Sequence, residues 1–131
     1  MRFITLVKGC GTQGPPPPSF LEAIARGRDE AVAQGRLIAT GGLSPLAAGD
    51  RLRVAGGRVL DGPFAEAKEV IGGYGVVEAA SREEALESAR WLMQLHAEHW
   101  PGWEGEVEVR QLFPDPAVPQ PGGAGAELAH A

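Results

Sequence analysis

A chain of 131 residues, 44% of them hydrophobic and 22% charged, has the size and composition of a single globular domain. Its net charge of −5 disfavours a nucleic-acid surface, because neutralising phosphates requires clustered lysines and arginines. No apolar run approaches the ~20 residues that span a bilayer, and a single cysteine, Cys10, excludes an internal disulfide, so we expect a cytoplasmic protein with no membrane partner.

The N-terminal part of the chain predicts a strand followed by a helix. Residues 2–8 are mostly apolar or β-branched, which is typical of a strand. The four prolines at 15–18 predict a stiff spacer. Ser19 and Glu22 have the spacing of a capping box, so we expect the helix to start at Ser19 and to end at Gly35.

The middle of the chain predicts a second strand and a hairpin. Residues 36–40 form a short strand that we expect the glycines at 41–42 to break. Side chains alternate along residues 51–60 on either side of the glycines at 56–57, a pattern typical of a β-hairpin. The composition of residues 61–64 predicts a further turn.

The C-terminal half predicts a strand, a helix and a last strand. Residues 70–79 form a long strand interrupted by glycines. Ser81 and Glu84 make a second capping box, and apolar residues recur behind it at helical spacing. Residues 106–113 alternate between charged and apolar side chains, as strands with one solvated face do. The remaining residues, 114–131, are so rich in Pro, Gly and Ala that we predict a disordered tail.

The order of these elements predicts an α+β fold of the ferredoxin-like βαββαβ type, with the hairpin inserted. Because strand–helix–strand crossovers are right-handed, both helices should cover the same face of the sheet. The first strand nevertheless carries apolar side chains on both faces, Phe3 and Val7 on one and Ile4 and Leu6 on the other. We therefore expect a homodimer with its sheets face to face, a dimeric α/β barrel. The alternative is that long loops cover the second face within a monomer.

One segment carries a family resemblance. Residues 61–69, Asp-Gly-Pro-Phe-Ala-Glu-Ala-Lys-Glu, followed by Gly72-Gly73-Tyr74, strongly resemble the signature of the YCII-related family and, more narrowly, its DGPF-domain branch. The helix start at 81–85 and the closing strand at 106–110 also fit, so the resemblance covers residues 1–113. It implies a dimeric α/β barrel of ferredoxin-like subunits.

The resemblance implies less about activity. Some relatives are enzyme-like, with a His–Asp pair in a cleft between sheet and helices, and DGPF proteins are often linked with extracytoplasmic-function sigma factors. The enzyme-like branch is expected to have its histidine near the start of the first helix, where residues 19–22 of this chain contain none. At Ala67 a threonine is common in the DGPF branch.

Three polar positions around the DGPF segment are candidates for chemistry. Asp61 either serves as a general base or ligand-binding group at the rim of a cleft, or caps a tight turn through its own backbone. Lys68, beside two glutamates, is either a solvated charge or a group that orients an anionic substrate. Tyr74 is either a ligand-binding pocket wall with a hydroxyl donor, or a core or interface residue.

A histidine- and tryptophan-rich stretch supplies the other candidates. His96 and His99 lie three residues apart on one helical face, next to Trp100 and Trp103. His96 falls on the apolar stripe, so we expect a packed histidine there, and His99 is the better candidate for acid/base catalysis. Trp100 is either a packing anchor or a ligand-binding wall. The histidine pair lacks the spacing and glutamate of a zincin motif, and we predict neither a metal nor a cofactor.

Two functions are compatible with the sequence. The first is an enzyme-like or small-molecule-binding domain with a cleft between sheet and helices, lined by Asp61, Tyr74 and His99. In that cleft His99 would be the acid/base and Asp61 would orient it or the substrate. The alternative is a non-catalytic regulatory or interaction module in stress signalling through a sigma factor.

Overall fold

The computed structural model describes residues 1–9, 14–44, 49–62, 70–114 and 116–118. These residues form six strands and two helices. In chain order the elements are β1 (Arg2–Gly9), α1 (Pro18–Ala33), β2 (Leu37–Gly42), β3 (Leu52–Ala55), β4 (Arg58–Asp61), β5 (Val70–Glu78), α2 (Arg82–His99) and β6 (Gly105–Leu112).

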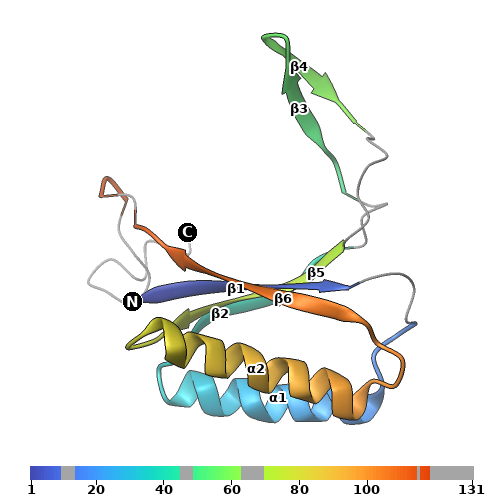
Figure 1. Ribbon diagram of the computed structural model, residues 1–131, viewed down its shortest axis with the longest axis vertical. Coiled ribbons are helices and arrows are strands. Elements are labelled where there is room, and N and C mark those ends of the chain that lie inside the picture. Colours follow the sequence, from blue (N-terminus) through green and yellow to red (C-terminus); the bar gives the residue numbers. More distant parts are fainter. Residues whose placement is uncertain (10–13, 45–48, 63–69, 115, 119–131) are drawn as a thin grey trace.

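Four of the strands make one antiparallel sheet in the order β2-β5-β1-β6, and β3 pairs with β4 in a separate hairpin. Figure 1 shows both helices side by side against one face of this sheet, with the hairpin rising on the opposite side. The predicted α+β class is confirmed, and this strand order is compatible with a ferredoxin-like fold.

The sheet therefore has two different faces. We call the helix-covered face the inner face; its buried core joins Phe3, Ala79 and Ala85. On the other, outer face, the register aligns Ile4 with Val76 and Leu6 with Tyr74. Neither helix covers this outer face in Figure 1. The apolar side chains predicted on both faces of the first strand are thus present.

The second helix begins as its sequence predicts. Ser81 is the N-cap residue of α2, and its hydroxyl accepts a hydrogen bond from the backbone N–H of Glu84 at 3.2 Å. The Glu84 carboxylate in turn accepts one from the backbone N–H of Ala80 at 3.4 Å. The first bond satisfies one of the donors that a helix start leaves without partners, and the second ties the preceding residue to the first turn.

The first helix does not begin at its predicted capping box. The N-cap residue of α1 is Pro17, with no side-chain cap, and Pro18 takes the first helical position. Proline is well suited there, because its fixed φ matches the helix and its missing N–H is not needed. The prediction that Ser19 caps this helix was wrong, whereas Gly35 follows the helix end with a φ of +72°, as predicted.

The glycines at the end of the second strand do not break it. Gly41 and Gly42 continue β2 and pair with Tyr74 and Gly73 of β5. The predicted break was wrong because this neighbouring strand supplies backbone partners for both glycines. By contrast, the predicted hairpin is confirmed, and its turn glycines at 56–57 both have positive φ.

Several predictions lie outside the described residues. They are the latter part of the 61–64 turn, the connector that contains Lys68 and most of the predicted tail. Among the helices that the structure does describe, none is long and apolar enough to cross a membrane.

The two predicted capping boxes provide a matched test of the helix starts. We expect Ser81→Ala to lower the free energy of unfolding by about 1 kcal/mol, because it removes the bond to the Glu84 amide. Ser19→Ala should leave it nearly unchanged, because Ser19 does not cap α1. Urea denaturation followed by circular dichroism measures both, and equal losses would contradict this assignment.

Candidate functional site

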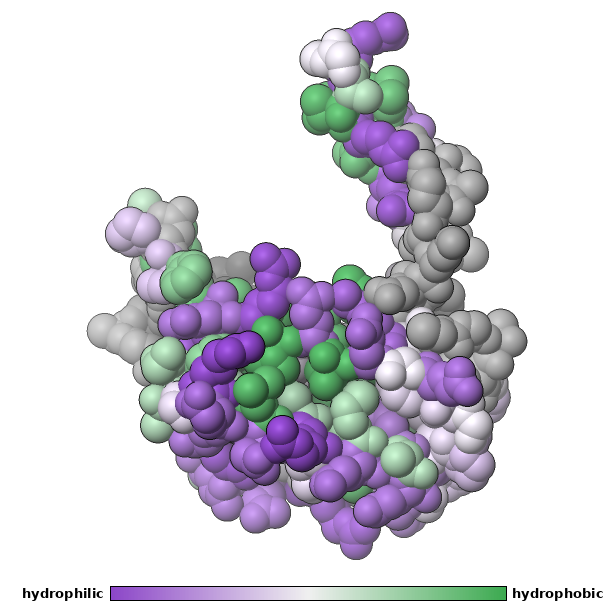
Figure 2. Space-filling model, viewed as in Figure 1, coloured by the Kyte–Doolittle hydropathy of each residue, from purple (hydrophilic) through white to green (hydrophobic). Residues whose placement is uncertain are grey.

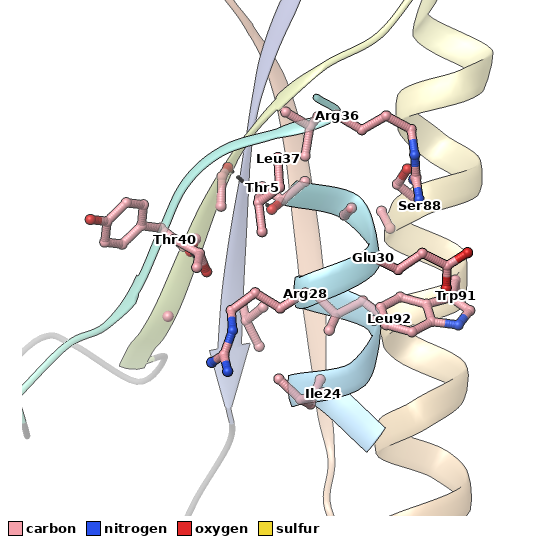
Figure 3. Close-up of a pocket in the computed structure, with 18 of the residues that line it drawn as sticks. Thr5, Ile24, Arg28, Glu30, Arg36, Leu37, Thr40, Ser88, Trp91 and Leu92 are labelled. Atoms are coloured by element: carbon pink, nitrogen blue, oxygen red, sulfur yellow. Dashed lines mark hydrogen bonds between the residues drawn. The ribbon is translucent and has the colours of Figure 1, made fainter. Parts of the chain in front are cut away.

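A cavity of about 560 Å³ lies between the inner face of the sheet and the two helices. Figure 3 shows side chains from β1, β2, α1 and α2 converging on it. Its volume falls within the range of ordinary small-molecule sites. The cleft that the sequence predicts between sheet and helices is therefore present, although its lining differs from the predicted one.

Glycines explain why the cavity exists. On the inner face, Thr5 and Val7 of β1 are aligned with Gly75 and Gly73 of β5, and all four line the cavity. The two glycines bring no side chains to the centre of the sheet, so the helices above them do not fill that space. The Thr5 hydroxyl donates to the carbonyl of Gly75 at 3.3 Å, which ties the two strands together at the floor.

The cavity walls come from the facing sides of the helices. Ile24 and Ala31 of α1 and Leu92 of α2 supply apolar lining. Trp91 lies directly over Gly27, where an added Cβ would approach the indole Cη2 to 2.0 Å. Because Gly27 has no side chain, the Trp91 indole can lie between the helices at the edge of the cavity.

Two arginines supply positive charge at the cavity. In Figure 3 the Arg36 side chain extends to Ser88 of α2, and Arg28 lies toward the other end of the cavity. The Arg36 Nε donates to Gln34 at 2.6 Å, while its terminal nitrogens make no hydrogen bond within the described ranges. Arg28 is engaged only at Nε, 3.6 Å from Asp29, among the residues that the structure describes.

Three glutamates also line the cavity, but each already has a partner. Glu84 belongs to the α2 cap, as described above. Glu87 is paired with Arg90, and Glu30 accepts a hydrogen bond from Gln34 at 3.3 Å. The terminal guanidinium nitrogens of the two arginines can therefore donate to an incoming group, while Glu30 and Glu84 keep their negative charge because their hydrogen-bond donors are neutral.

Tyr74 is one of the residues that line the cavity. Its side chain shares the outer face with Leu6, and its ring covers Gly41, where an added Cβ would be 2.9 Å from Cε1. The prediction of Tyr74 as a ligand-binding pocket wall stays a prediction. The alternative, an interface residue on the outer face, fits this position.

The structure does not bring the predicted acid/base pair together within the chain. Asp61 ends β4 in the hairpin, opposite Leu52, and is exposed. His99 ends α2, where its Nε2 lies 4.0 Å from the Glu98 carboxylate. Figure 1 shows the hairpin and α2 on opposite sides of the sheet, and neither residue lines the cavity. Their pairing in catalysis stays a prediction.

Trp100 belongs to an aromatic cluster at the C-terminal end of α2. His96 lies at its centre, with ring-centroid distances of 4.6 Å to Phe20 and 4.3 Å to Trp103. Trp100 packs against Phe20 at 5.1 Å and is half-buried. The rings join the start of α1 to the end of α2, so the packing role left open for Trp100 fits this geometry.

His96 is buried, with 5% of its surface exposed, as predicted for a packed histidine. Its Nδ1 lies 2.8 Å from the Leu92 carbonyl, so this nitrogen carries the proton and donates. Burial lowers the pKa of His96 below 6.5, and the bond to Leu92 opposes that shift only in part. The folded environment of His96 therefore favours the neutral imidazole.

The residues that make the cavity were mostly missed from the sequence. Thr5 lies in β1, Arg36 just before β2 and Ser88 in the middle of α2, and no local motif connects them. The signal that did point here was the glycines that interrupt the predicted strand at 70–79, because glycine within a strand allows close approach of a backbone or a ligand.

In the described part of the chain, no group of three or more His, Cys, Asp or Glu is arranged to hold a metal ion. His96 and His99 do not form such a site together: His96 is enclosed by aromatic rings, and His99 faces Glu98.

Lowering the pH should destabilise the protein through His96. Because its pKa is lower in the folded chain than in the unfolded one, the unfolded chain takes up the proton first as the pH falls. The contribution of His96 is thus fully present above about pH 6.5 and decreases as the pH drops toward the folded pKa. As the pH is lowered from about 8 to about 5, the melting temperature of His96→Gln should fall less steeply than that of the wild type.

His99→Gln is the matched control for this measurement. His99 lies outside the aromatic cluster, so the variant should keep the pH dependence of the wild type. An unchanged slope in His96→Gln would show that His96 does not cause it.

Comparisons with known proteins place the chain in a family. Residues 1–113 match the family model of the YCII-related domain. An uncharacterized protein of Rhizobium meliloti (strain 1021) is 37% identical over 93 residues, an alignment that covers 65% of this chain and 71% of that protein. The match is to the YCII-related domain as a whole and does not distinguish the DGPF-domain branch.

Proposed function

Since the chain belongs to the YCII-related domain family, we propose that it binds a small amphipathic molecule with a negatively charged group in the cavity between sheet and helices. We further propose that it belongs to the DGPF-domain branch, on the strength of residues 61–69 and Gly72-Gly73-Tyr74. The predicted link to sigma factors stays a prediction.

One observation carries the proposed binding function, namely the glycine floor of the cavity. A central strand normally brings β-branched side chains to a covered face, and glycine at such positions weakens the strand. Here Gly73 and Gly75 add no side chains to a hollow of about 560 Å³ between elements that otherwise pack, and a Cβ at Gly75 would already approach the Thr5 hydroxyl to 3.1 Å. A ligand that approaches the sheet closely would explain why the strand has glycines here although they weaken it.

The lining supports the class of ligand. Ile24, Ala31 and Leu92 suit an apolar body, and Thr5 and Ser88 offer hydroxyls. The terminal guanidinium nitrogens of Arg36 suit a carboxylate, because this fork-shaped donor pairs with planar anions. An apolar body with one anionic end therefore matches both parts of the lining.

Filling the cavity should abolish binding. In Ala31→Phe the added ring occupies the hollow, and we expect the Kd for octanoate, measured by titration calorimetry, to rise about tenfold or more. Ala33→Phe places the same ring at an exposed position of α1 outside the cavity and should bind like the wild type. Failure of the wild type to bind either octanoate or 1-octanol would overturn the proposed function.

Removing the charge of Arg36 should separate the contribution of charge to ligand affinity from that of apolar contact. For Arg36→Gln we expect octanoate to bind about threefold to tenfold more weakly and 1-octanol to bind as it does to the wild type. Arg26→Gln changes an exposed arginine of α1 that does not line the cavity and should alter neither. Equal losses for both ligands would show that Arg36 acts through packing, not charge.

We also propose that the protein is a two-fold homodimer joined through the outer faces of its sheets. Ile4, Leu6, Tyr74 and Val76 share this face, and neither helix covers it. A symmetric dimer buries the same apolar surface from both subunits at once. The proposed dimer leaves the cavity on the inner face open to ligands.

A further inference from the structure

The β3–β4 hairpin has two chemically different faces. Its register aligns Leu52 with Asp61 and Val54 with Val59, so these four side chains share one face. The other face carries Arg53, Ala55, Arg58 and Leu60. We call the hairpin, residues 52–61, the arm, and the face of Leu52, Val54 and Val59 its apolar face.

The apolar face of the arm is open to solvent within one subunit. Leu52, Val54 and Val59 are 71%, 72% and 68% exposed, the highest values among large aliphatic residues in the described chain. Figure 2 shows apolar residues along the arm, standing clear of the body of the molecule. An isolated two-stranded hairpin is marginally stable in water at best, so this arm lacks the packing that would hold its shape.

A second copy of the chain is the partner that fits the arm. The arm rises on the outer side of the sheet, the side opposite the helices (Figure 1). The proposed dimer places a partner subunit on that same side, so its surface would lie alongside the arm. The apolar face of the arm would then continue the apolar interface begun by Ile4, Leu6, Tyr74 and Val76.

The area of the interface favours the same partner. A stable interface buries about 800 Å² per subunit, more than a few half-exposed side chains of one sheet face supply. Burying three aliphatic side chains of each arm adds substantially to that area.

We propose that each arm clasps the partner subunit, burying Leu52, Val54 and Val59 against it. This inference rests on the proposed dimer and adds to it a defined second contact. Ordering of the arm is therefore coupled to dimer formation, since the hairpin gains its missing packing only when the partner is present.

Sedimentation of the full chain over a range of concentrations tests the clasp. The wild type should sediment as a dimer. Val54→Lys places a charge on the apolar face and should raise the dimer dissociation constant about tenfold or more. Ala55→Lys adds the same charge at the neighbouring position on the other face and should change it less than about twofold.

Amide hydrogen exchange provides a readout that does not depend on the variants. The amides of residues 52–61 should be protected at concentrations where the wild type is dimeric and lose that protection on dilution. A wild-type dimer that Val54→Lys leaves intact, with an unprotected arm, would overturn the clasp and leave the dimer standing. A monomeric wild type would overturn the proposed dimer as well as the clasp. Neither result bears on the proposed binding of octanoate, which is measured separately.

Discussion

Gly73 and Gly75 leave the middle of a central strand without side chains on the face that the helices cover. Protein interiors are otherwise closely packed, so such a gap must be filled from above or remain open. The helices do not fill it, because their closest approach is set elsewhere, by Trp91 over Gly27 and by the aromatic cluster around His96. The cavity thus follows from two constraints: β5 has no side chains at Gly73 and Gly75, and other contacts fix the position of the helices. The strands and helices that meet there place its polar groups.

The sequence predicted the features that depend on residues close together in the chain. Its predictions failed where the structure depends on pairing between distant strands. The capping box at Ser81, the hairpin and the burial of His96 follow from local spacing, and the structure has all three. Ser19 has the same local spacing as Ser81, yet the preceding prolines already begin the helix and leave no role for its hydroxyl. Gly41 continues a strand because β5 lies beside it, which no local pattern could reveal.

The candidate site shows the same limit. Asp61, Tyr74 and His99 were selected for their chemistry. Strand alternation turns the Tyr74 ring to the outer face, and Asp61 in the hairpin and His99 in α2 lie on opposite sides of the sheet. The groups that do converge, such as Thr5 and Arg36, are unremarkable in sequence and become neighbours only through the sheet order and the crossovers. Predicting them would have required the register of β1 against β5, since a shift of one residue exchanges the two faces.

The position of Trp91 has a consequence for observing the molecule. The chain contains three tryptophans. Two of them, Trp100 and Trp103, lie in the aromatic cluster, and Trp91 alone of the three lines the cavity. Its indole is 43% exposed, so it emits from a partly hydrated setting that changes when water leaves the cavity. The protein therefore carries a built-in optical reporter at its candidate site, with the other two indoles as a constant background.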